Sequence, residues 1–309
     1  MSTLDPTDEL LGHAVAIKGR GLWIDARRRL IRNRAAMVSL VILSIITLMA
    51  IFAPLLSPYD FDAQDYDRVS CAPSWWPDSS ALCFAGGSHW FGTDAVGRDL
   101  FVRVLFGARV SLAVGLVATL VSLLIGVFYG AVAGYLGGRV DALMMRLVDI
   151  LYSLPFVFFV IILMVVFDRN FILLFVAIGA VEWLTMARIV RGQTLSIKQK
   201  EFIEAARAAG VGPLAIIARH VIPNVVGPVV VYVTLTVPGV ILTESFLSFL
   251  GLGIQEPLTS WGVLVSDGAG QMETAPWMLV FPALFMAVTL FCFNFVGDGL
   301  RDALDPKDR

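Results

Sequence analysis

Three carboxylates fall within or at the ends of long apolar runs of the sequence, and they are the first residues that could do chemistry. They are Asp149, Glu182 and Glu244. If those runs cross a membrane, a charge buried there costs about 2.5–3.5 kcal/mol, so each carboxylate needs a structural or functional reason. Structural hydrogen bonding and the lining of a polar path both remain open for each of them. A proton relay would need a connected series of such groups, and these positions do not form one.

Side-chain patterns typical of enzymes and cofactor sites are missing from the sequence. No lysine follows a glycine, so the phosphate-binding pattern GxxxxGK[ST] is absent. The three histidines are scattered, which suggests neither a metal cluster nor a histidine-based catalytic triad. We therefore predict that the chain is not itself an enzyme, holds no metal and binds no cofactor of its own.

The elements that must position the three carboxylates are long apolar helices. Of the 309 residues, 58% are hydrophobic and 16% charged, and the mean hydropathy is +0.81. A membrane-spanning helix needs about 20 mostly apolar residues, and only helices or closed barrels satisfy their backbone groups in lipid. The apolar blocks show no alternation of period two, so they predict an all-α integral membrane protein with six transmembrane helices. The blocks are Ala35–Leu56, Val110–Gly138, Ile150–Phe167, Asn170–Ala187, Val221–Thr243 and Ala275–Gly297.

The lysines and arginines predict how these helices are oriented. With the N-terminus in the cytoplasm, 18 of the 23 basic residues lie in inside segments and four lie in outside segments. Positive charge is retained on the cytoplasmic side during insertion, so both termini are expected there, in a multi-pass protein of the cytoplasmic (inner) membrane. The expected regions are a cytoplasmic tail with a basic amphipathic segment (1–34), the first transmembrane helix (35–56), an extracytoplasmic loop (57–108), a core with five transmembrane helices and a cytoplasmic loop at 188–222 (109–298), and a cytoplasmic tail (299–309).

The basic segment at 23–34 reads WIDARRRLIRNR. Such a helix can lie on the inner membrane surface, with its apolar residues at the interface and its arginines toward anionic headgroups. An equally good interpretation is that its positive charge only orients the first transmembrane helix. Both interpretations remain open from the sequence.

Two of the three cysteines, Cys71 and Cys83, share the expected extracytoplasmic loop. A disulfide between them would close a small loop and contribute roughly 3 kcal/mol to local stability. Two free thiols are the alternative.

The end of the same loop, from residue 92, reads GTDAVGRDLFVRVLFGAR. Thr93 is a suitable N-cap, and acid-to-base pairs follow at i,i+4 spacing. We expect a short amphipathic helix outside the membrane, with exposed pairs that shape the loop. The pairs are Asp94–Arg98 and Asp99–Arg103.

Residues 201–210, EFIEAARAAG, form a short alanine-rich segment in the expected cytoplasmic loop. Most of these residues favour a helix, and Gly210 is a suitable stop. Glu201 and Glu204 near the N-terminus complement the helix dipole. About ten residues are too few for a stable helix in water, so the segment must dock on its own protein or on a partner. The expected docking face has one aromatic and three small side chains: Phe202, Ala205, Ala206 and Ala209.

The spacing within this loop resembles the EAA loop of ABC importer permeases. The pattern of that family is EAA-x3-G-x9-I-x-L-P, and the matching residues here are Glu204, Ala205, Ala206, Gly210 and Pro223. The chain departs from the pattern at two positions, where a histidine replaces Ile and an isoleucine replaces Leu. The histidine puts a polar ring at the expected membrane boundary.

Longer stretches narrow the resemblance to the dipeptide and oligopeptide importer permeases. HWFGTDAVGRDL, GARVSLAVG, FLSFLGLGIQEPLTSWG and FNFVGDGLRDALDPKDR resemble that family. WIDARRRLIRNRAA and MARIVRGQTLS look closest to its oligopeptide C-subunit branch. The resemblance covers about residues 20–309.

The resemblance implies a type I ABC importer permease architecture with a cytoplasmic coupling helix. It implies a homologous second permease as partner, two cytoplasmic ABC ATPases that bind ATP and Mg, and an extracytoplasmic binding protein that delivers peptide. Membrane lipid surrounds the chain, and no nucleic acid is expected. In the family the EAA helix sits in a groove on the ATPase. The expected coupling residues are Glu201, Glu204, Ala205, Ala206, Gly210 and Pro223.

Two other classes of protein compete with this interpretation. A secondary transporter or channel would need no ATPase, but the EAA helix speaks against it, as does the lack of a charge relay or an inverted repeat. A membrane scaffold would leave the fifth apolar block unexplained, since Pro223, Pro228 and Pro238 predict a helix broken in three places.

Overall fold

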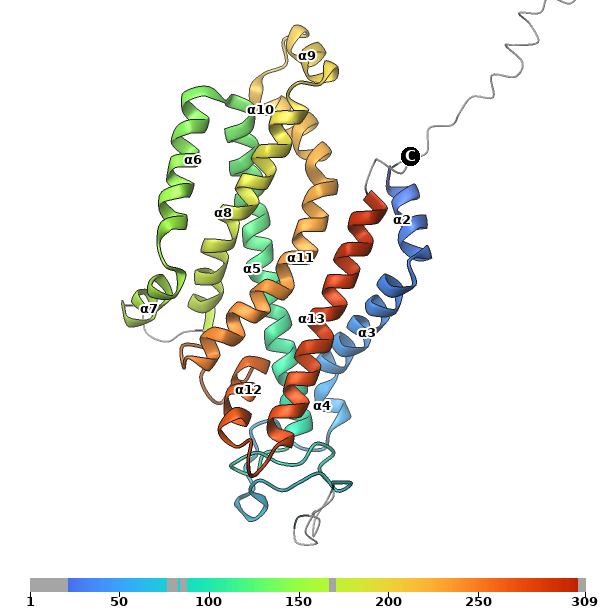
Figure 1. The fold of residues 1–309 in the computed structure, drawn as a ribbon, viewed down its shortest axis with the longest axis vertical. Helices are drawn as coiled ribbons and strands as arrows, with labels where there is room; N and C mark the ends of the chain where they lie inside the picture. Colours follow the sequence, from blue (N-terminus) through green and yellow to red (C-terminus); the bar gives the residue numbers. More distant parts are fainter. Residues whose placement is uncertain (1–21, 77–82, 84–87, 167–170, 305–309) are drawn as a thin grey trace, which may run out of the picture.

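The computed structural model describes residues 22–76, 83, 88–166 and 171–304. The described residues are mostly helical, and the one β-bridge among them is isolated. The long helices run side by side, with α9 at one end and the loops near α4 at the other (Figure 1). The elements are α2 (Leu22–Arg32), α3 (Arg34–Ile51), α4 (Ala53–Leu56), η1 (Tyr66–Arg68), α5 (Leu100–Leu136), α6 (Gly138–Ser153), α7 (Phe156–Val166), α8 (Phe171–Ile197), α9 (Glu201–Ala208), α10 (Pro213–Ile216), the π-helical turn η3 (Ile217–Val221), α11 (Ile222–Phe249), α12 (Trp261–Gly270) and α13 (Trp277–Leu304).

Several of these helices can cross a membrane. Among the described residues, α3, α5, the run Pro213–Phe249 and α13 are long and apolar enough, and α6 with α7 adds a fifth span if the bent pair is counted as one. The predicted block Asn170–Ala187 lies in α8 from Phe171 onward, and the 27 residues of α8 reach about 40 Å. In the part of the chain that the structure describes, all six predicted blocks are mainly helical, while length and composition support four or five spans.

The predicted third span differs in form from a straight helix. α6 and α7 meet at a bend of 80°. Leu154, between them, has an extended backbone (φ −75°, ψ 129°) and precedes Pro155. A residue before proline is driven away from helical angles, and proline lacks the N–H that would continue the helix. The proline therefore explains why the block 150–167 bends.

The 37-residue helix α5 lies at the centre of the fold, in contact with α8, α11 and α3. It begins at Leu100, so the helix takes in the last part of the predicted loop 57–108. Gly126, Gly130 and Gly134 form a seam of small residues that faces α8. A Cβ at Gly130 would lie 2.3 Å from the Ala187 carbonyl oxygen, which is too close for any side chain. Small residues at this spacing let two helix backbones pack closely in a membrane.

The helix α11 is continuous from Ile222 to Phe249, so the prediction of a helix broken in three places is wrong. Pro223 lies in its first turn, where a missing N–H is harmless. Pro228 and Pro238 lie inside the helix, which bends midway in Figure 1. In lipid, neighbouring helices and local backbone adjustment tolerate such prolines without a break.

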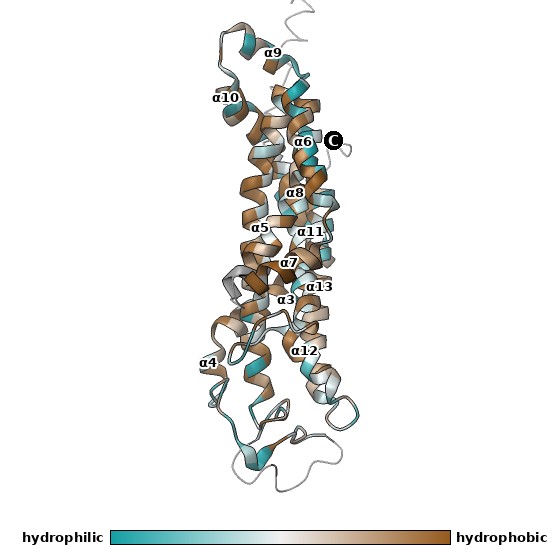
Figure 2. Cartoon of the chain, turned by 90° about the vertical axis from the view of Figure 1, so that its left-hand side faces the viewer, coloured by the Kyte–Doolittle hydropathy of each residue, from teal (hydrophilic) through white to brown (hydrophobic). Residues whose placement is uncertain are grey.

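Two apolar clusters occupy opposite parts of the long axis. One contains Trp261 and Trp277 and joins α3, α5, α11, α12 and α13. The other joins the far end of α5 to α8, α9, η3 and α11. Apolar residues dominate the middle of the helices, and polar segments gather toward the ends (Figure 2). The α9 loop therefore rests on its own core at one polar end of the molecule.

Candidate functional site

The α9 loop is the segment 198–221 between α8 and α11, and three residues separate the end of α8 from the start of α9. Lys200 occupies the N-cap position with an extended backbone, and its side chain makes no capping hydrogen bond. Glu201 and Glu204 lie in the first turn, where their charge favours the helix dipole, and both are exposed. The helix has eight residues, so tertiary contacts must hold it.

Those contacts come from two side chains on the inner face of α9. Ile203 is fully buried, and Ala206 is only 9% exposed. Both belong to the apolar cluster at this end of the molecule, which also contains Ala131, Met186 and Ile217. The α9 helix is thus fixed to α5, α8 and η3.

Tyr135, near the end of α5, adds a polar contact to the same attachment. The Arg207 Nε–H donates to the Tyr135 hydroxyl oxygen at 3.2 Å. The Arg207 guanidinium lies 5.2 Å from the centre of the Tyr135 ring, and the Lys198 Nζ lies 5.8 Å from it. Cations at this distance from an aromatic face are attracted to it. The ring therefore connects the end of α5 to both sides of the α9 loop.

Gly210 ends the α9 segment with a left-handed backbone, φ +78°. Its N–H donates to the Arg207 oxygen at 2.9 Å, and the Val211 N–H donates to the Ala206 oxygen at 3.1 Å. These two bonds form a Schellman motif, in which glycine is favoured because it has no Cβ. Gly210 thus sets the direction in which the chain leaves α9.

After α10, the chain forms a π-helical turn before Pro223. The Ile222 N–H donates to the Ile217 oxygen, five residues back. Such turns are found as single insertions in longer helices. His220, the departure from the EAA pattern, is half-buried in this turn. The run Pro213–Phe249 nevertheless acts as one long helical segment.

The outer face of α9 differs from the predicted docking face at one position. Phe202, Ala205 and Ala209 are exposed as expected, with Phe202 at 43%. Ala206 points inward, because the helix uses it together with Ile203 to pack on its own core. The exposed surface is therefore Phe202, Ala205 and Ala209, bordered by Glu201 and Glu204.

The intramembrane carboxylates have separate surroundings. Asp149 on α6 lies 2.7 Å from the Arg188 guanidinium on α8, and both side chains are exposed. Glu182 on α8 is half-buried. The structure does not bring these two carboxylates together with Glu244.

Glu244 is fully buried at the opposite half of the molecule. Its carboxylate accepts hydrogen bonds from Ser248 and Ser260 at 2.7 Å each and from Ser111 at 3.4 Å. Ser111 in turn accepts the Trp261 backbone N–H at 3.1 Å. This network joins α5, α11 and the start of α12. The sequence singles out Glu244 but gives no sign of its serine partners.

A second α6–α8 ion pair is missed by the sequence reasoning. Arg191 donates from Nε and Nη2 to the two oxygens of Asp141, at 2.5 and 2.6 Å. Their separation in the sequence is 50 residues, so no local spacing could reveal the pair. Together with Asp149–Arg188, it fixes α6 beside α8.

The expected helix at the end of the 57–108 loop is wrong. Thr93 lies in the isolated bridge and caps no helix; Asp99 caps α5, accepting the Val102 N–H at 2.8 Å. The Asp94–Arg98 pair exists, but it is buried in a turn and not exposed. Asp99 pairs with the His89 ring at 2.7 Å and not with Arg103. One predicted i,i+4 pair is therefore present but buried, and the other is replaced by the contact between Asp99 and His89.

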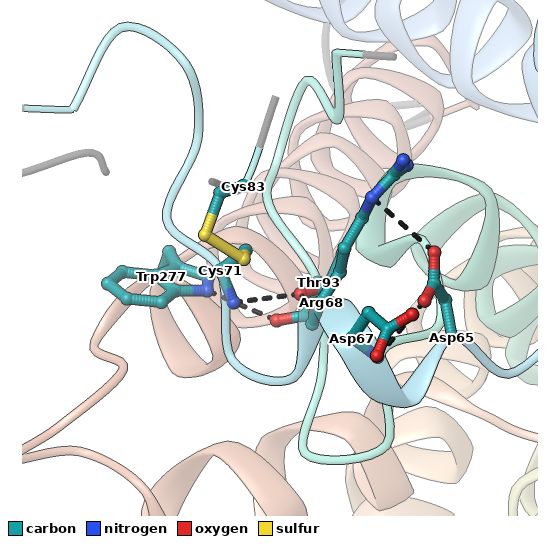
Figure 3. Close-up of a disulfide and its surroundings, with 7 residues drawn as sticks. All are labelled: Asp65, Asp67, Arg68, Cys71, Cys83, Thr93 and Trp277. Atoms are coloured by element: carbon teal, nitrogen blue, oxygen red, sulfur yellow. Dashed lines mark hydrogen bonds and ion pairs between the residues drawn. A yellow bond between two sulfur atoms is a disulfide. The ribbon is translucent and has the colours of Figure 1, made fainter. Parts of the chain in front are cut away.

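Cys71 and Cys83 form a disulfide in the structure, with their Cα atoms 5.6 Å apart (Figure 3). Around it, the Cys71 N–H donates to the Thr93 hydroxyl at 2.8 Å, and that hydroxyl donates to the Arg68 oxygen at 2.5 Å. The Trp277 indole N–H reaches the Thr93 carbonyl oxygen at 3.3 Å. The loop is thereby tied to the start of α13.

The helical fold and the α9 loop can be compared with those of known families of membrane proteins. The chain belongs to the family of binding-protein-dependent transport system inner membrane components, which it matches over residues 123–309. Residues 21–73 match the N-terminal TM domain of oligopeptide transport permease C. The chain is therefore a multi-pass permease subunit of the inner membrane.

Individual relatives cover nearly the whole chain. The oligopeptide transport system permease protein OppC of Escherichia coli K12 is 59% identical, over 98% of this chain and 97% of the relative. OppC of Haemophilus influenzae is 56% identical, over 95% and 91%. The dipeptide transport system permease protein DppC of Bacillus subtilis is 47% identical, over 92% and 86%. A chain of the inward-facing MetNI methionine ABC transporter, 20% identical, covers 67% of this chain and 96% of its own length with a TM-score of 0.55, so it shares the type I importer fold.

Proposed function

We propose that the chain is the membrane-spanning permease subunit of an ATP-driven ABC importer that moves oligopeptides into the cell. In this proposal a homologous second permease completes the path, and two cytoplasmic ABC ATPases bind ATP and Mg. An extracytoplasmic binding protein delivers the peptide. The α9 loop couples closure of the ATPases to alternating access of the path. The observation that carries the proposal is the short helix α9. Its inner face is buried against the rest of the chain, and Phe202, Ala205 and Ala209 on its outer face are exposed.

The attachment of α9 suits a coupling role. A force on the exposed face passes through Ile203 and Ala206 into the cluster that joins α5, α8 and η3. Small side chains at Ala205 and Ala209 allow a partner surface to approach the backbone closely. ATP binding would then favour whichever state of the path the closed ATPases fit better.

The proposed orientation places the α9 end in the cytoplasm. The helix α2, the α9 loop and the end of α13 lie at the same end of the molecule, and the disulfide loop lies at the opposite end (Figure 1). Basic residues are concentrated in the segments at the α9 end, which supports that side as the inner one. Both termini are therefore proposed to be cytoplasmic.

The names of the relatives support peptides as the substrate class. They are permease proteins of oligopeptide, dipeptide and glutathione transport systems. We take oligopeptides as the substrate because several relatives with that name match over more than 90% of both chains. The chain contributes the path, and the delivery protein is expected to carry most of the selectivity.

Crosslinking tests whether α9 docks on an ATPase. Ala205→Cys places a thiol on the exposed face, and Ala206→Cys, one residue on, places it on the buried face. With the four transporter subunits in vesicles, Ala205→Cys is expected to crosslink to an ATPase carrying a single cysteine, and Ala206→Cys is expected not to. Failure of Ala205→Cys in every nucleotide state would contradict the coupling role.

Uptake measurements test the proposed activity itself. Glu204→Lys reverses a charge on the exposed rim of α9 and leaves the buried contacts in place. We expect at least a tenfold lower rate of ATP-driven uptake of a labelled oligopeptide, with normal membrane insertion. Peptide uptake that continues without ATP would favour a secondary transporter or channel.

A further inference from the structure

A polar cavity lies between α2 and the end of α13, at the same end of the molecule as α9. Figure 1 shows these two helices beside one another, and they are in contact. The cavity has a volume of about 420 Å³ and is lined by Arg29, Arg32, Asn33, Gly299, Asp302 and Ala303. None of these residues belongs to the α9 loop, and an inference drawn from them does not depend on the proposed function.

The cavity is strongly cationic on its α2 side. Arg29 and Arg32 are three residues apart and therefore share one face of the helix. Arg29 has an interaction within the protein, whereas the Arg32 guanidinium makes no hydrogen bond or ion pair with any residue that the structure describes. Arg27, Arg28 and Arg34 add positive charge nearby, and Asp25 is the one acid of α2.

Asn33 and Gly299 shape the inner wall of the cavity. The Asn33 side-chain oxygen accepts the Ala36 N–H and caps α3, which leaves the amide nitrogen as a donor. A Cβ at Gly299 would lie 2.5 Å from the Ala36 Cβ, so the glycine lets α13 approach α3 closely. Asp302 is the one carboxylate among the lining residues, against two arginines, and each guanidinium carries five N–H donors, more than one carboxylate can accept.

Exposed apolar side chains lie on α2 and α3, the two helices joined at Asn33. Ile24 and Ile31, seven residues apart on one face of α2, are 57% and 53% exposed. Val38 and Val41 are exposed on α3, the first membrane-spanning helix. A ligand with an anionic head and apolar tails could meet cations in the cavity and exposed apolar side chains on the same two helices. Basic pockets beside membrane helices recognise lipid headgroups in this way.

We propose that the cavity between α2 and α13 binds the phosphate headgroup of an anionic phospholipid. Arg29 and Arg32 bind the phosphate, with guanidinium N–H groups that match its oxygens. The Asn33 amide provides a further donor. The acyl chains lie along the exposed apolar residues of α3. A lipid held there ties α2 to the membrane–water boundary and to the end of α13.

Native mass spectrometry of the full-length chain in detergent tests this site. The probes are phosphatidylglycerol, which is anionic, and phosphatidylethanolamine with the same acyl chains, which carries no net charge. We expect phosphatidylglycerol to be retained at least tenfold more tightly. The variant Arg29→Gln/Arg32→Gln is expected to weaken its retention roughly 25-fold, about fivefold for each arginine. Arg32→Gln alone, which removes the arginine without a described partner, is expected to weaken it about fivefold.

A second double variant provides the matched control. Arg139→Gln/Arg146→Gln removes the same charge from exposed positions of α6 and leaves the cavity intact. This control is expected to retain phosphatidylglycerol like the unmodified chain. Equal losses in the two double variants would show general surface attraction and overturn the site. Equal retention of the two lipids would overturn it as well. Glycerol phosphate is added as a soluble competitor for bound phosphatidylglycerol. If it displaces the lipid as effectively as free phosphatidylglycerol does, the cavity binds a soluble anion, and the proposal is contradicted.

Discussion

Glu244 shows how a single buried residue can organise several elements. Its carboxylate accepts from serines of α5, α11 and the start of α12, and Ser260 also caps α12 by accepting the Val263 N–H at 3.2 Å. A buried carboxylate is tolerated where hydrogen bonds replace its hydration. These hydrogen bonds support a structural role for Glu244, and the path-lining role that the sequence also leaves open stays a prediction.

Two replacements of Glu244 test whether its hydrogen bonds to the serines stabilise the fold. Glu244→Gln keeps a side-chain oxygen that can accept from the serines, so it should be mild. Glu244→Ala leaves buried hydroxyls without an acceptor, and each unsatisfied group costs about 1–3 kcal/mol. We expect Glu244→Ala to lower the free energy of unfolding by at least about 2 kcal/mol, measured by thermal unfolding in detergent. Equal stability of the two variants would show that the network does not hold these elements.

Gly210 provides a second prediction at the scale of a residue. Its φ of +78° is readily adopted by glycine and tolerated by asparagine, but it strains a β-branched residue. Gly210→Val should therefore disturb the end of α9, and Gly210→Asn should not. The readout is amide hydrogen exchange of residues 201–211, expected to be faster in Gly210→Val alone. Unchanged exchange in Gly210→Val would mean that the Schellman motif does not define the loop.

At the scale of elements, the α5–α8 pair depends on a seam of glycines. Gly126, Gly130 and Gly134 recur every four residues and leave no room for side chains against α8. The Asp141–Arg191 and Asp149–Arg188 pairs hold α6 on α8 next to this seam. Close helix packing and the two ion pairs therefore make α5, α6 and α8 one unit.

Gly130→Leu tests this unit. The added side chain would collide with the Ala187 oxygen, 2.3 Å from the Cβ position, so the two helices must separate. We expect loss of the folded chain or a thermal unfolding midpoint lower by at least about 5 °C. The control is Gly192→Ala on α8, where a Cβ meets nothing within 4 Å. That control should be neutral or slightly stabilising because alanine is the better helix former.

The two faces of α9 give a prediction that distinguishes its packing on the chain's own core from its proposed contact with an ATPase. Ile203 is buried in the core, whereas Phe202, the preceding residue, is exposed. Ile203→Ala should loosen the helix and raise amide exchange across residues 201–208. Phe202→Ala should leave exchange unchanged and weaken only the proposed ATPase contact, measured by copurification. A loss of α9 protection in Phe202→Ala would show that its side chain is structural.

At the scale of the whole molecule, the apolar blocks predict the helices well, but their arrangement depends on distant contacts. Sequence periodicity cannot show that Ala206 turns inward, because that depends on the cluster formed by Tyr135 and Ile217. Nor can i,i+4 spacing show that Asp94 and Arg98 are buried. Arg98 also reaches Glu256, 2.8 Å away and far along the chain. Local sequence patterns predict where the helices lie, whereas contacts between distant residues decide which helix faces are buried and which are exposed.

The proposed orientation can be tested by thiol labelling of intact cells. Asp62→Cys lies exposed near the disulfide end of the molecule, and Ala205→Cys lies exposed at the α9 end. A reagent that cannot cross the inner membrane should label Asp62→Cys directly and Ala205→Cys only after the membrane is permeabilised. The opposite order of labelling would reverse the topology.

The unbroken length of α5 has a mechanical consequence. This helix extends about 55 Å as one rod, from the Asp99 cap beside the disulfide loop to Tyr135 beneath Arg207. Tilting such a rod by about 5° moves one tip by about 5 Å relative to the other. A displacement of the Tyr135 end of α5 therefore moves the Asp99 end as well, unless the helix bends. If α9 is the coupling helix that we propose, α5 provides a direct mechanical link between the two ends of the molecule.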